Sequence, residues 1–155
     1  MIGGGQVEQF DRLAHGLFGA PRAAIEAVLV EIHVLPAHMQ RGGGGVALIP
    51  TSPEQARNRD THYPYRADSY FQYLTGFIEP EAVLVIVVGR ADAAPQAILF
   101  CREKNLEREI WDGFRHGPDG AREMFGFDAA HAIGELEGKL PELMADQPAL
   151  WFSIG

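Results

Sequence analysis

The sequence predicts an α/β fold, in which the strands of a single sheet alternate with helices that cover it. The first observation is Ala82–Val88, an apolar run that contains four valines and shows no alternation with polar residues. Such a run is typical of a central strand covered on both faces. The second is the order of the patterns, because strand-like segments are bracketed by helical ones. The third is composition: 155 residues, 46% hydrophobic and 22% charged, suit one globular domain.

An amphipathic helix is expected over Pro21–Leu35, ahead of the first strand. Pro21 suits the first helical turn and Pro36 ends the pattern. The apolar positions between them repeat at helical spacing: Ile25, Val28, Leu29 and Ile32. Residues 1–40 differ in composition from the remainder, and we treat them as a lead-in segment. The glycines of Arg41–Gly45 predict a flexible break before a short strand at Val46–Ile49.

Two more strands are expected beside the central one. Ser69–Thr75 is rich in aromatic residues and predicts a strand that Gly76 ends. Gly89–Pro95 supplies a turn after Ala82–Val88, so Gln96–Cys101 is predicted to form a hairpin-like pair with it.

The C-terminal third predicts helices and one last strand. Pro118–Phe125 has proline at its start and Gly126 just after its end, which favours a compact helix. A further apolar stripe at helical spacing is expected to be split into two pieces by Gly138 and Pro141; its members are Leu136, Leu140 and Leu143. Ala149–Ile154 predicts a short final strand.

Charge and cysteine content exclude several classes of function. The net charge is −8 and there is no run of Lys or Arg, which disfavours binding to nucleic acid or to an anionic membrane surface. Cys101 is the only cysteine, so no disulfide forms within the chain. No apolar run approaches the roughly 20 residues of a membrane-spanning helix. The first residues lack the pattern of a secretory signal, and we expect a cytoplasmic protein.

No complete catalytic or metal-binding set emerges from the residues themselves. The histidines form no HExxH pattern; Asp60 and His62 stand two apart, either as a weak ligand pair or as a polar loop pair. Gly3–Gly5 and Gly42–Gly45 do not follow a strand and open a helix, which argues against a phosphate loop. Cys101 lies in a predicted strand and is interpreted as a small buried hydrophobe. The acidic residues expected in loops are scattered: Asp60, Asp68, Asp92 and Asp112.

Trp111 is the most unusual side chain of the sequence. It lies in Glu107–Gly113, EREIWDG, with charged residues on both sides. One interpretation is half-buried packing; the other is a ring presented to a ligand or partner, since Trp is favoured at interface hot spots.

Three segments, in this order, resemble the creatinase/prolidase-type N-terminal domain, and in detail that of bacterial Xaa-Pro aminopeptidases (aminopeptidase P). They are VALIPTSPEQARNRDTHYPYRADSYFQYLTGFIEPEAVLV (Val46–Val85), ILFCREKNLEREIWDGFRHGPDGAREMFG (Ile98–Gly126) and the weaker IGELEGKLPELM (Ile133–Met144). The resemblance implies a ribonuclease-H-like mixed sheet flanked by helices. It also implies that residues 41–155 are this domain without its last helix, and that residues 1–40 are an atypical lead-in.

The resemblance further implies a role beside catalysis. The family removes the N-terminal residue of peptides whose second residue is proline. It uses two divalent metal ions, usually manganese, whose ligands belong to a C-terminal pita-bread domain, so no cofactor is expected in this chain. Asp60 in NRD and Trp111 in EIWDG resemble residues that reach the active site of a neighbouring subunit in a homo-oligomer. They would shape the substrate entrance there. The alternative is a free-standing protein-interaction module without a peptidase partner.

Overall fold

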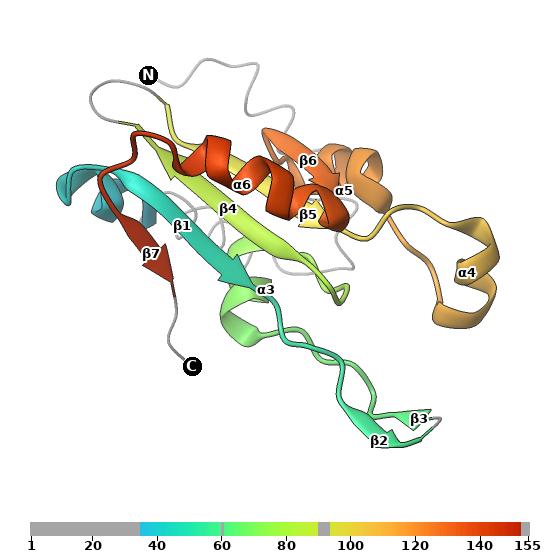
Figure 1. The fold of residues 1–155 in the computed structure, drawn as a ribbon. Helices are drawn as coiled ribbons and strands as arrows, with labels where there is room; N and C mark the ends of the chain where they lie inside the picture. The colour runs from blue at the N-terminus through green and yellow to red at the C-terminus, as the bar shows by residue number, and fades with distance from the viewer. Residues whose placement is uncertain (1–34, 60, 90–93, 153–155) are drawn as a thin grey trace, which may run out of the picture.

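The computed structural model describes residues 35–59, 61–89 and 94–152 and shows one mixed sheet with helices on both faces (Figure 1). The strand order is β6-β5-β4-β1-β7. Their bounds are β1 Gly45–Pro50, β4 Val83–Val88, β5 Gln96–Cys101, β6 Ala129–Ala132 and β7 Leu150–Phe152. The three inner strands pair antiparallel, whereas β6 and β7 pair parallel at the two edges. The α/β class with a mixed sheet is therefore confirmed, as is the antiparallel pair of β4 and β5.

The central strand β4 is covered on both faces, as its unbroken apolar sequence predicted. Successive side chains of a strand point to opposite faces. Leu84, Ile86 and Val88 join a core with residues of the helical stretch 35–41, of α3 (Ser69–Thr75) and of α5 (Gly117–Phe125). Val85 joins a second core on the opposite face, beneath α6 (Leu136–Met144). Figure 1 shows α6 crossing that face of the sheet.

Ser69–Thr75 forms helix α3, so the predicted strand at these residues is wrong. The Asp68 carboxylate caps the helix, since its Oδ1 accepts a hydrogen bond from Phe71 N at 2.8 Å. Gly76 ends it with a φ of 67°, in the left-handed region that favours glycine. The buried residues Phe71, Leu74 and Thr75 are spaced as one helical face. End capping and burial therefore outweigh the β-propensity of the aromatic residues.

One proline that was expected to split a helix, Pro141, does not do so. α6 runs unbroken from Leu136 to Met144 through Gly138 and Pro141. Proline removes one hydrogen bond, but side chains from both halves of the helix pack against the sheet and hold it together: Leu136, Leu143 and Met144. Pro36 is the second of the described helical residues 35–41. Most of the helix predicted over Pro21–Leu35 falls outside the described residues. Helix Pro118–Phe125 is confirmed as α5, which begins one residue earlier.

The glycines where β1 begins, Gly44 and Gly45, form a close-packed turn rather than a flexible break. Gly44 has a φ of 89°, and a Cβ there would lie 2.5 Å from the carbonyl oxygen of Val88. Gly45 has a φ of 131°, and its Cβ would collide with the carbonyl oxygen of Ala149. The turn thus fits between the end of β4 and the residue before β7, where no side chain has room.

Two elements stand away from the sheet in Figure 1. One is the hairpin of β2 (Ala56–Asn58) and β3 (Thr61–His62). The other is α4 (Leu106–Asp112), which follows β5. Among the residues that the structure describes, no helix is both long enough and apolar enough to span a bilayer.

Candidate functional site

Helix α4 presents apolar side chains to solvent. Asn105 caps its start, with Oδ1 accepting from Arg108 N at 3.0 Å, and Gly113 ends it. Trp111 is 86% exposed, so the interpretation of this ring as half-buried packing is wrong for the chain by itself. Its apolar neighbours are similarly uncovered: Leu106 (71%), Ile110 (78%) and Phe114 (63%). Water-exposed apolar groups in one place mark a contact surface.

The second predicted site residue, Asp60, lies outside the described residues. The strands on either side of it are exposed, and His62 lies on β3. The hairpin carries Tyr63 directly after β3, with the guanidinium of Arg57 5.9 Å from the centre of its ring. The position of Asp60 relative to Trp111 therefore stays a prediction.

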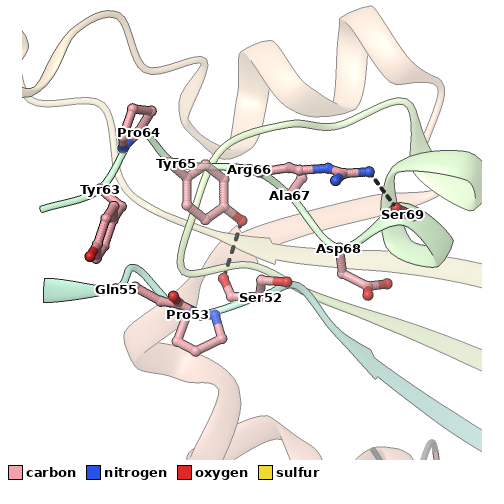
Figure 2. Close-up of a pocket in the computed structure, with 10 residues that line it drawn as sticks. All are labelled: Ser52, Pro53, Gln55, Tyr63, Pro64, Tyr65, Arg66, Ala67, Asp68 and Ser69. Carbon is pink, nitrogen blue, oxygen red and sulfur yellow. Dashed lines mark hydrogen bonds between the residues drawn. The ribbon is translucent and has the colours of Figure 1, made fainter. Parts of the chain in front are cut away.

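A cavity of about 350 Å³ opens where the hairpin joins the body (Figure 2). One wall comes from the connection after β1, with Ser52 and Pro53; the other comes from the connection before α3. Tyr65 ties the two together, because its hydroxyl lies 2.7 Å from Thr51 Oγ1 and donates to the carbonyl oxygen of Ser52 at 3.2 Å. Burial raises the pKa of Tyr65. Tyr65 therefore fixes the base of the hairpin as a neutral hydrogen-bonding group.

A buried polar cluster lies where the chain returns from α4. Oε1 of Glu79 accepts a hydrogen bond from the His116 backbone N–H at 2.8 Å and lies 2.5 Å from His116 Nδ1. Arg102 Nη2 is 3.9 Å from Glu79 Oε2, and both side chains are more than nine-tenths buried. Sequence reasoning missed this cluster, because no pattern links Glu79 to a histidine 37 residues away.

Cys101 is fully buried, which confirms the interpretation of this residue as a core hydrophobe. Burial, with a smaller contribution from the Glu79 carboxylate, raises the pKa of its thiol to about 12. A thiol that keeps its proton at neutral pH is not a nucleophile.

The described part of the chain has no residue set for a metal centre. No three His, Cys, Asp or Glu side chains converge within residues 35–59, 61–89 and 94–152. The donors present there do not fit the two-metal centre that the family resemblance implies.

The sequence model of a protein family, described as aminopeptidase P, N-terminal domain, matches residues 28–151 of this chain. The chain belongs to this family. The match starts inside the segment that we treated as a lead-in and includes α4, the hairpin and the cavity. The family prediction from the three sequence segments is thereby confirmed.

Curated relatives of the chain include Xaa-Pro aminopeptidases. The Escherichia coli K12 enzyme is 46% identical over 112 residues, which are 72% of this chain and 25% of that protein. Human Xaa-Pro aminopeptidase 3 is 33% identical over 118 residues, 75% of this chain and 23% of that protein. The chain thus spans about a quarter of the length of these relatives.

Solved structures agree with the sequence matches. A variant of E. coli aminopeptidase P in complex with substrate superposes with a TM-score of 0.75 at 39% identity, covering 81% of this chain and 28% of that one. Zinc-substituted E. coli aminopeptidase P in complex with product gives 0.76 at 38% identity, with 84% and 29% covered. Aminopeptidase PepP of Pseudomonas aeruginosa gives 0.74 at 42% identity, with 83% and 28% covered.

Proposed function

We propose that this chain serves as the non-catalytic N-terminal domain of a metal-dependent Xaa-Pro aminopeptidase, where it mediates oligomerisation and shapes the substrate entrance of a neighbouring subunit. The main support for the proposal is the exposure of Trp111, which is 86% exposed on a helix that stands away from the sheet. A ring held in water without a partner is costly in the isolated chain and becomes favourable once another surface covers it.

The chemistry of peptide cleavage belongs, in this proposal, to a separate catalytic domain of the same enzyme. Two divalent metal ions, manganese in the family resemblance, would activate water there. This domain contributes positioning: Trp111 supplies an apolar wall for a proline-containing peptide, and Asp60 supplies negative charge near the peptide ammonium. The cytoplasm is the proposed location.

The test joins the full chain to the catalytic domain of the E. coli relative and compares Trp111→Ala with the parent. Loss of the aromatic contact should lower kcat/KM for an Xaa-Pro peptide by roughly five- to a hundred-fold, or about 1–3 kcal/mol. Thermal stability should stay within about 0.5 kcal/mol, because an exposed side chain contributes little to folding.

Phe152→Ala is the matched control, since Phe152 is a 61% exposed aromatic on the edge strand β7, away from α4. It should leave kcat/KM unchanged. If Trp111→Ala matches Phe152→Ala in kinetics, Trp111 has no role at the entrance. A joined enzyme that binds a foreign protein through α4 but never hydrolyses Xaa-Pro peptides would instead favour the free-standing interaction module.

A further inference from the structure

We infer that Lys104 is a positioning residue that fixes the direction of the α4 arm, defined as residues 105–116. The inference rests on the proposed function, because positioning matters for catalysis only if Trp111 acts at the substrate entrance. The arm leaves the body after β5 and returns to it at α5. Lys104 stands at the point of departure.

The two ends of the arm meet at a narrow neck. Gly117, where α5 begins, has a φ of 68°, and a Cβ built on it would lie 2.9 Å from Lys104 Cβ and 3.1 Å from Lys104 N. Only glycine permits this approach. The segment that returns to the body is held independently, since His116 is hydrogen-bonded to the buried carboxylate of Glu79.

The ammonium group of Lys104 joins three different parts of the arm. Nζ donates to the carbonyl oxygen of Arg115 at 3.1 Å, beyond the helix. It lies 3.3 Å from Oε1 of Glu109, in the middle of α4, and 4.4 Å from the centre of the Phe114 ring. One charge therefore connects the helix, the segment after it and the neck.

These contacts should affect the orientation of α4 far more than the free energy of unfolding of the domain. The Lys104 side chain is 47% exposed, and an exposed ion pair contributes little to folding. The outer face of the arm is uncovered, since the side chains of Ile110 and Trp111 are 78% and 86% exposed. Loss of the ammonium would let α4 swing about the neck while the sheet remains folded.

The sequence offers a matched control, because it contains two lysines, Lys104 and Lys139. Lys139 on α6 also pairs with a glutamate at 3.5 Å, but that residue, Glu135, directly precedes the same helix. Lys104→Met and Lys139→Met remove the same charge and keep a similar apolar stem. Only the first breaks the connection between arm and neck.

The first measurement is the time-resolved fluorescence anisotropy of Trp111 in the full chain. The chain contains two tryptophans, so a Trp151→Phe background leaves Trp111 as its single tryptophan. Lys104→Met should roughly double the amplitude of nanosecond depolarisation, whereas Lys139→Met should leave it unchanged and Lys104→Arg should restore most of the parent value. Equal anisotropy in Lys104→Met and Lys139→Met, with both variants folded by circular dichroism, would overturn the inference.

The second measurement uses the joined enzyme and separates this inference from the proposed function. Lys104→Met should lower kcat/KM about fivefold, mainly through KM, and should have no further effect in a Trp111→Ala background. If Trp111→Ala has the same kcat/KM as the parent, the proposed entrance role is refuted. The anisotropy measurement then tests by itself whether Lys104 fixes the direction of α4. An impaired Trp111→Ala enzyme with an unaffected Lys104→Met enzyme would refute the positioning role alone.

Discussion

The thiol of Cys101 illustrates how burial sets the chemistry of a residue. It lies in β5 with no exposed surface, next to the core residues Leu99 and Phe100. Its pKa of about 12 stands above the ordinary value of 9.0, so the folded state favours the protonated form. The resulting contribution to stability is complete below about pH 9 and is lost as the pH rises toward 12.

Cys101→Ala should therefore reduce the loss of stability on going from pH 8 to pH 10. The parent is expected to lose about 1 kcal/mol more than the variant over this interval, because the unfolded thiol ionises there and the folded one does not. Urea unfolding of both proteins at the two pH values measures the difference. At pH 8 the native parent should also resist a thiol reagent; rapid labelling without unfolding would contradict the buried position.

Single residues of the candidate site were predictable in type but not in environment. The segment EREIWDG drew attention to Trp111, yet the charges around it are compatible with either packing or exposure. Only the position of α4 off the sheet decides between them. The Glu79–His116 pair had no local signal at all, because Glu79 lies between α3 and β4, whereas His116 directly precedes α5.

At the scale of elements, the sequence predicted best where burial was unambiguous. The boundaries of β5 match the expected Gln96–Cys101, and β4 differs from its prediction by one residue. β6 was missed because its sequence, AAHA (Ala129–Ala132), contains none of the β-branched or large aromatic residues that favour strands. The strand forms because it pairs in parallel with β5. α3 was mistaken for a strand although Asp68 and Gly76 carried its capping signals.

The importance of the cap on α3 can be measured directly. Asp68→Ala should lower the free energy of unfolding by about 1 kcal/mol, because Phe71 N loses its hydrogen-bond acceptor at the end of a short helix. Asp68→Asn keeps an acceptor oxygen and should recover most of that loss. Chemical denaturation of the three proteins gives the comparison. Identical midpoints would mean that packing of Phe71 and Leu74 alone maintains α3.

At the scale of the whole molecule, the exposed apolar face of α4 should drive association. Burying an isoleucine side chain is worth about 1.5–3 kcal/mol, so Ile110→Asp should weaken self-association of the chain at least tenfold. Sedimentation velocity over a concentration series measures the effect. Ile78→Asp is the control, since Ile78 is also exposed (56%) but lies beyond α3 rather than on α4.

Equal weakening by both variants would show that association depends on net charge rather than on α4. A parent chain that stays monomeric at all concentrations would remove α4 as an oligomer contact for this chain. Either result leaves the family assignment intact, because it rests on residues 28–151 as a whole.

Because its two ends meet at the neck, the α4 arm can also change in length and sequence as a separate unit. Lys104 and Gly117 already touch, so the sheet is indifferent to how many residues lie between them. Doubling the length of such a closed loop costs only about 0.6 kcal/mol of chain entropy. Selection could therefore lengthen, shorten or rewrite the arm, and so alter the contact surface that it presents, without rebuilding the core that carries it.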